Sequence, residues 1–228
     1  MSTEHTAAPA IADMSEQMQI RLEKRAKLIE SGREAYPVGL LDSEGNRVEP
    51  NHIEDLRAEY DPKLESGELK AGDETDRVVH VGGRVVFVRN TGKLCFATLQ
   101  GGTEGKRIQA MLSLAEVGEE SLAEWKSLVD LGDHVFVTGR VIVSRRGELS
   151  IMVTDWKMAS KALRPMPVLH KDLNEETRVR QRYLDLMVRE EARELVKKRA
   201  LITRTVRRVL EDHGYIEVET PILQLVHG

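Results

Sequence analysis

The middle of the chain alternates between apolar and polar residues, as β-strands do when one of their faces is buried. Five stretches carry this pattern, at residues 78–89, 94–99, 107–112, 134–144 and 149–158. Turn-forming glycines stand between them at Gly92, Gly132 and Gly147. Residues 113–129 follow a helical pattern instead. The sequence therefore predicts three strands, one helix and two further strands.

This order of elements is that of an OB-fold, a five-stranded Greek-key β-barrel that binds oligonucleotides. Other small barrels share parts of the pattern, and the order alone leaves them open. The adjacent glycines Gly82 and Gly83 interrupt the first strand and predict a β-bulge there. With the helices predicted on either side of the barrel, the fold class is α+β.

A helix is predicted before the barrel, over residues 16–31, with Ser15 as its N-cap and Gly32 as its C-terminal stop. Three basic residues lie three and four apart on it, so they share one face, which we expect to be exposed: Arg21, Lys24 and Arg25. Residues 1–14 are expected to form a disordered tail. Residues 39–76 are polar and acidic, and predict a loop or insertion with at most a short helix near 52–60.

Two prolines, Pro165 and Pro167, mark a linker after the barrel. Asn174 is placed to cap a helix that runs to Met187, and a longer helix is predicted over residues 190–213. A short strand over residues 215–220 would follow it. These boundaries predict a tail (1–14), an N-terminal helix with an acidic insertion (15–77), a barrel domain (78–160), a linker (161–173) and a last segment (174–228).

Strand alternation also predicts which side chains face outward from the barrel. The inward set is aliphatic, whereas Phe96, Gln109 and Glu148 fall on the outer face. An exposed aromatic ring can stack on a nucleic-acid base, an amide can donate and accept hydrogen bonds, and a carboxylate can only accept them. The alternative is that the phase of the second strand is misread and that Phe96 belongs to the core.

Composition narrows the classes of function. The net charge is −4, which by itself does not indicate nucleic acid, but residues 189–208 hold eight basic side chains against three acidic ones. The single cysteine, Cys95, excludes an internal disulfide and fits a reducing compartment. We find no run that would span a bilayer, no signal peptide, no phosphate-binding loop and no metal-ligand spacing among the histidines.

Several short strings resemble the bacterial lysyl-tRNA synthetases. Those in the barrel are Gly83-Arg84, Gly92-Lys93, Phe96–Leu99, Ile108-Gln109 and Gly147–Ser150, followed by Lys161–Pro165. Beyond the linker, Arg180–Leu186 is similar to the entry of the catalytic domain, and Gly214–Pro221 resembles motif 1 of class II synthetases. The resemblance begins near residue 18. Aspartyl and asparaginyl relatives share the last two strings more loosely.

The resemblance implies roles for particular residues. Phe96 would stack on an anticodon base, Gln109 and Glu148 would hydrogen-bond to anticodon bases, and Arg89 would contact a base or its backbone. The basic helix residues Arg21, Lys24 and Arg25 would touch the tRNA backbone, and Pro221 would lie in a dimer interface. The partner would be tRNA-Lys.

The resemblance also implies an activity for the whole enzyme, which would be a cytoplasmic homodimer that uses lysine, ATP and Mg²⁺. Motifs 2 and 3 of the class II domain do not occur in these 228 residues. We therefore expect a fragment that holds no catalytic residue and is inactive alone. The alternatives are a fragment of an aspartyl- or asparaginyl-tRNA ligase, and a non-catalytic RNA-binding protein built on an OB-fold.

Overall fold

A computed structural model describes residues 15–41, 45–102, 104–167, 169, 171 and 173–223. The chain divides into two compact units, Met1–Pro167 and Val168–Gly228, and each is described by itself. The predicted tail at 1–14 lies outside the described residues.

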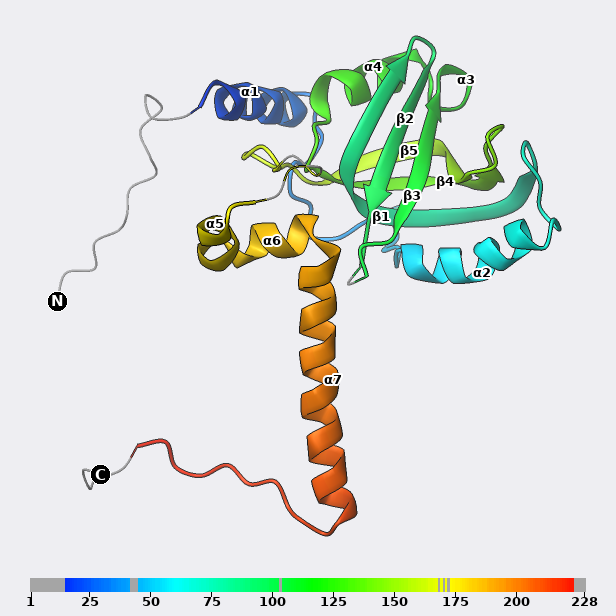
Figure 1. Cartoon of the computed structure of the whole chain (residues 1–228). Helices are drawn as coiled ribbons and strands as arrows, with labels where there is room; N and C mark the ends of the chain where they lie inside the picture. The colour runs from blue at the N-terminus through cyan, green and yellow to red at the C-terminus, as the bar shows by residue number, and fades with distance from the viewer. Residues whose placement is uncertain are drawn as a thin grey trace. The chain divides into compact units, whose positions relative to one another are not determined.

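The first unit is built on a closed barrel of five strands (Figure 1). The strands are β1 (Glu74–Thr91), β2 (Leu94–Gln100), β3 (Arg107–Ser113), β4 (His134–Val143) and β5 (Leu149–Ser160). Their order around the barrel is β1-β2-β3-β5-β4, in which β3 and β5 run parallel and the other neighbours run antiparallel. The predicted OB-fold is therefore confirmed.

The barrel interior follows the alternation of the sequence. Along β2 the side chains of Cys95, Ala97 and Leu99 are buried, while those between them are partly exposed. The predicted phase of the second strand is thus confirmed, and Phe96 does not belong to the core.

The bulge of β1 lies further along than the sequence predicted. Gly82 and Gly83 pair regularly with β4, and the shift in register against β2 falls between Val85 and Phe87. The requirement for glycine at position 83 has a different reason, because a Cβ there would lie 2.9 Å from the Leu99 Cβ. Close packing between strands, and not a bulge, excludes a side chain at this position.

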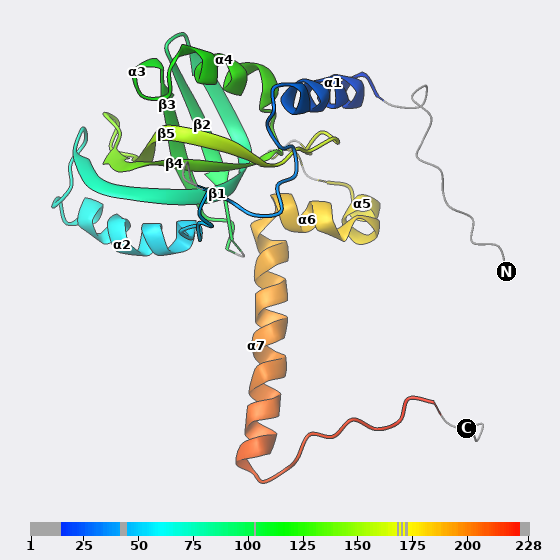
Figure 2. The same ribbon diagram turned by 180° about the vertical axis from the view of Figure 1, so that it is seen from behind.

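Helices cover the two ends of the barrel, as both views show (Figures 1 and 2). At one end lie α3 (Leu114–Val117) and α4 (Glu119–Leu128), separated by Gly118, whose φ of 81° ends the first helical turn. The predicted helix at 113–129 is therefore two. Trp125 of α4 packs edge-on against Trp156, with ring centroids 5.1 Å apart.

The other end of the barrel is covered by α2 (Ile53–Glu65). The acidic region therefore holds a longer helix than the sequence predicted. Ile53, Leu56 and Tyr60 repeat at helical spacing and are buried in the barrel core, at 1–4% exposure. The acidic residues on its other face conceal this stripe when charge alone is considered.

The N-terminal helix α1 (Glu16–Glu30) is capped by Ser15, which accepts a hydrogen bond from the Met18 N–H, and is followed by Gly32 at a φ of 79°. The sequence predicted that the basic face of this helix is exposed, but the structure buries part of it. Arg21 is only 8% exposed and donates to the carbonyls of Ala162 and Leu131, at 2.9 and 2.8 Å. We expected the Arg21 guanidinium to face solvent, but it donates to these backbone carbonyl groups instead.

A buried polar cluster holds this helix to the barrel. The Lys161 ammonium, which is fully buried, donates to Asp130 and Asp133 at 2.7 Å each. Lys24 of α1 donates to the other oxygen of Asp130 at 2.6 Å. Burial opposes ionisation of Asp130, but the hydrogen bonds from Lys161 and Lys24 outweigh it and lower the pKa of this carboxyl.

The second unit consists of α5 (Glu175–Arg180), α6 (Arg182–Val188) and α7 (Glu190–Asp212). Asn174 caps α5 as predicted, but the helix breaks at Gln181. Asp185 is 1% exposed and accepts hydrogen bonds from Arg182 and Arg189, at 3.2 and 3.0 Å. These bonds fold α6 against the start of α7.

The strand predicted over residues 215–220 is not formed. A strand needs a neighbour to satisfy its backbone groups, and the described residues of this unit offer none to it. Helix α7 also leaves its apolar stripe uncovered, with exposed fractions of 45–64% at Leu195, Ile202, Val206, Val209 and Leu210.

Candidate nucleic-acid interface

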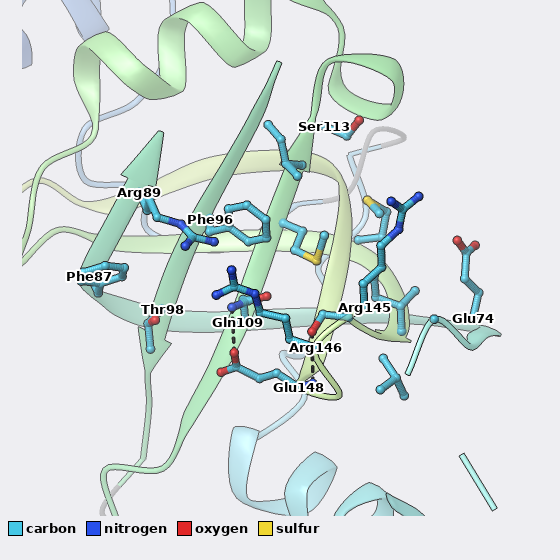
Figure 3. A pocket seen from close by; sticks show the side chains of 17 residues that line it. Glu74, Phe87, Arg89, Phe96, Thr98, Gln109, Ser113, Arg145, Arg146 and Glu148 are labelled. Carbon is cyan, nitrogen blue, oxygen red and sulfur yellow. Dashed lines mark hydrogen bonds between the residues drawn. The ribbon is translucent and has the colours of Figure 1, made fainter. Parts of the chain in front are cut away.

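A groove of about 840 Å³ crosses the outer face of the barrel. Its wall is formed by all five strands and by the turn between β4 and β5, and Figure 3 shows the side chains that line it. All four residues predicted for anticodon binding line this groove: Arg89, Phe96, Gln109 and Glu148. The pairing of the strands in the barrel brings together residues that lie up to 59 positions apart along the chain.

The guanidinium of Arg89 lies over the phenyl ring of Phe96 in the groove. Arg89 of β1 is the cross-strand partner of Phe96 of β2, and its guanidinium carbon lies 4.7 Å from the centroid of the phenyl ring. A guanidinium plane and an aromatic ring can each stack on a base. The pair therefore presents a flat cationic surface to the groove.

A polar pair lies beside this surface, as Figure 3 shows. The Gln109 amide donates to a Glu148 carboxylate oxygen at 2.9 Å, and the Ser150 hydroxyl lies 3.1 Å from the Gln109 amide oxygen. Ser150 is completely buried. These contacts orient the amide before any ligand arrives, and leave one amide N–H and one carboxylate oxygen for a base edge.

Among the groove residues that the sequence analysis did not predict, three have side chains that could contact a nucleic acid. They are Phe87, which is 56% exposed, and the neighbouring Arg145 and Arg146 at the tip of the turn between β4 and β5. Adjacent arginines in a glycine turn just before Glu148 were a signal that the sequence contained. No comparable signal marked Phe87, because its orientation depends on where the bulge lies.

The charge of the groove favours a polyanion. Arg89, Arg145 and Arg146 line it together with two glutamates, Glu74 and Glu148. Phosphate contacts by basic side chains provide a large share of the affinity in nucleic-acid complexes, while amides and carboxylates read bases. The groove thus places side chains suited to phosphate contacts, to stacking and to base recognition on one face of the barrel.

No group of three histidine, cysteine or acidic side chains in the described part of the chain is placed to hold a metal ion. Among the same residues, no helix combines the length and the apolar character needed to cross a bilayer.

Two family matches define the class of protein. Residues 79–159 match the OB-fold nucleic acid binding domain, and residues 174–228 match the class II tRNA synthetases of the D, K and N group. The groove therefore lies on the part of the chain that matches the OB-fold nucleic acid binding domain, and the sequence after the linker matches class II tRNA synthetases.

Over most of its length, the chain is similar to lysine–tRNA ligases. It is 55% identical to the lysine–tRNA ligase of Kineococcus radiotolerans and 52% identical to that of Mycolicibacterium gilvum, in each case over 95% of this chain. It is also 37% identical, over 97% of its length, to the lysylphosphatidylglycerol biosynthesis bifunctional protein LysX of Mycobacterium avium, of which it covers 17%. The chain spans 40% of the length of the two ligases.

Proposed function

We propose that this chain recognises the anticodon of tRNA-Lys, as part of a protein that attaches lysine to that tRNA in an ATP-dependent reaction. The observation that carries the proposal is the groove on the OB domain, where Phe96, Arg89 and the Gln109–Glu148 pair converge. Identity to lysine–tRNA ligases supports lysine over aspartate or asparagine as the amino acid.

Recognition divides between two kinds of contact. The Phe96 ring and the Arg89 guanidinium hold bases by stacking, which tolerates any base. The free N–H of Gln109 donates to a base carbonyl, and Glu148 accepts from a neighbouring ring N–H. Uracil offers this acceptor and donor side by side, and the pair therefore favours an anticodon rich in uridine. Arg145 and Arg146 hold the phosphates.

The basic residues of α1 contribute unequally to this proposal. Arg21 is occupied by two carbonyls, and Lys24 is paired with Asp130. Arg25 is partly exposed, with its guanidinium carbon 5.7 Å from the Tyr36 ring centroid. We therefore propose Arg25, with the exposed part of Lys24, for the tRNA backbone, and assign Arg21 to the attachment of the helix.

The remaining parts of the proposal concern the whole enzyme. It would act in the cytoplasm as a homodimer, with Pro221 in the interface, and would use lysine, ATP and Mg²⁺. The class II synthetase match supports ATP as a substrate. We assign none of the described residues to that chemistry, and we derive no catalytic step from them. The test is a tRNA-charging assay on a protein that contains this chain and has the full length of its relatives. The assay compares lysine with aspartate and asparagine as the amino acid substrate.

The anticodon proposal is tested by binding of a tRNA-Lys anticodon stem–loop to the full chain. We expect affinity to fall as salt rises, because phosphate contacts release counterions. Phe96→Ala should weaken binding by about 1–3 kcal/mol and leave the barrel folded, because the ring is outside the core. Salt-independent binding, or unchanged affinity in the Phe96 variant, would contradict the proposal.

The base-reading pair has its own readout in the same assay. Gln109→Ala and Glu148→Gln should reduce the preference for uridine over other bases in the anticodon. A matched control is Glu119→Gln, which removes an exposed carboxylate at the start of α4, outside the groove. A free-standing RNA-binding protein would bind here too, but the full-length protein would then not charge tRNA.

A further inference from the structure

The chain has three phenylalanines, and two of them lie in the groove. Phe136 is buried at 3% exposure, whereas Phe96 is partly exposed and Phe87 is 56% exposed. The groove thus contains a second aromatic ring, to which the proposed anticodon contacts give no role.

The bulge in β1 is the reason that Phe87 faces the groove. Before the bulge, the odd-numbered residues Val79, Val81 and Val85 point into the barrel. The register shift between Val85 and Phe87 leaves Val85 and Val86 both buried, and it reverses the alternation after them. Without the extra residue, Phe87 and Arg89 would both point inward. Bulges re-aim side chains in this way next to binding sites.

The strand register then sets the spacing between the two rings. Phe87 pairs with Thr98, and Arg89 pairs with Phe96, so the two phenylalanines are diagonal neighbours on adjacent strands. Diagonal neighbours on one face lie about 7–8 Å apart, within reach of aromatic side chains. The Arg89 guanidinium lies against one of the rings, where it can contact the backbone between two splayed bases. Figure 3 shows the three side chains on one wall of the groove.

We propose that Phe87 is a second base-stacking residue, which takes the nucleotide next to the one on Phe96. This inference rests on the proposed function, because it assumes single-stranded RNA in the groove. Stacking on a phenyl ring does not depend on which base is present. Phe87 therefore adds affinity and extends the site by one nucleotide, while base identity is read by Gln109 and Glu148.

The test compares substitutions of Phe87 in the full chain, with the tRNA-Lys anticodon stem–loop as the probe. Phe87→Ala and Phe87→Leu should weaken binding about 5-fold to 150-fold, whereas Phe87→Tyr retains the aromatic face and should bind like the wild type. The matched control is Val78→Ala on the same strand, since Val78 is also 56% exposed but does not line the groove. Melting followed by tryptophan fluorescence should show all variants folded.

Abasic substitutions in the loop locate the nucleotide. The penalty of Phe87→Ala should disappear at one abasic position, and that of Phe96→Ala at the adjacent position. A penalty for Phe87→Ala that persists at every abasic position, or is no larger than that of Val78→Ala, overturns the inference. If the wild type binds and Phe96→Ala weakens it, this second result leaves the proposed function intact. If the wild type does not bind at all, both fail together.

Discussion

A single buried hydroxyl sets the geometry of the base-reading pair. The Ser150 Oγ atom lies 3.1 Å from the Gln109 amide oxygen and 2.9 Å from the Glu148 carbonyl oxygen, and it is closed off from solvent. Its single proton can serve only one acceptor at a time, but both contacts keep the amide oxygen toward the barrel. The amide N–H groups consequently face Glu148 and the groove.

At the residue scale, His134 predicts a pH dependence of stability. Burial, and then repulsion from the Arg84 guanidinium, lower the pKa of His134 from 6.5 to about 4. The unfolded chain therefore binds a proton at higher pH than the folded one. Above pH 6.5 the imidazole is neutral in both states, and its effect on the free energy of unfolding is constant. As the pH falls toward 4, the free energy of unfolding decreases by about 1–3 kcal/mol.

The measurement is unfolding of the first unit between pH 7 and 4.5, followed by the fluorescence of the buried Trp125 and Trp156. His134→Gln should flatten the profile, whereas His52→Gln, which removes an exposed histidine of the same unit, should leave it unchanged. This window lies above the range in which Asp130 gains its proton, because the pKa of that carboxyl is lowered from 3.8. Parallel profiles for the wild type and His134→Gln would contradict the assignment.

At the scale of elements, two adjacent glycines in β1 serve as an internal comparison. A Cβ at Gly82 would meet only Phe136, at 3.9 Å, which is ordinary contact. A Cβ at Gly83 would come within 2.9 Å of the Leu99 Cβ, which belongs to the neighbouring strand and cannot swing away. Only one of the two positions requires glycine.

Gly83→Ala should therefore destabilise the barrel by about 1–3 kcal/mol through overpacking. Gly82→Ala should be neutral or stabilising by up to about 1 kcal/mol, because glycine in a strand interior costs entropy. Urea unfolding of both variants measures the difference. Equal midpoints would show that β1 and β2 can separate to admit a methyl group.

Helix α2 packs on the barrel core although its sequence is acidic. Its acidic residues predicted a solvated insertion, yet Ile53, Leu56 and Tyr60 occupy the same face and are buried in the core. Helices owe most of their stability to such packing and not to intrinsic propensity. The acidic region is thereby part of the barrel structure.

At the scale of the whole molecule, the two units differ in how much of their apolar surface they bury. The barrel encloses a continuous core, whereas α7 buries only Ala192 among its 23 residues. Exposed amphipathic helices open readily because little packing opposes fraying. The two units should therefore differ in stability when the chain is studied alone.

Hydrogen exchange resolved by segment tests this difference in a dilute monomer. We expect slow exchange in β1 to β5 and fast exchange in α7. As concentration rises, protection of α7 should increase, because its apolar stripe can then bury itself against another molecule. Protection of α7 equal to that of the strands at low concentration would show that its helix is stable without further packing.

The sequence by itself determined the features that depend on near neighbours. The alternation in β2, β3 and β5, the caps at Ser15 and Asn174, and the glycine turns were all predicted. Three of the groove residues followed from this alternation, since a strand without interruption keeps its phase. The role of each in binding RNA remains a proposal.

Only the tertiary structure decided features that depend on distant residues. The bulge after Val85 turned Arg89 and Phe87 outward, the carbonyls of Leu131 and Ala162 buried Arg21, and residues 215–220 formed no strand. The reason is the same in each case: where a side chain points, or whether a strand forms, depends on which backbone lies opposite. Local periodicity contains no information about that partner.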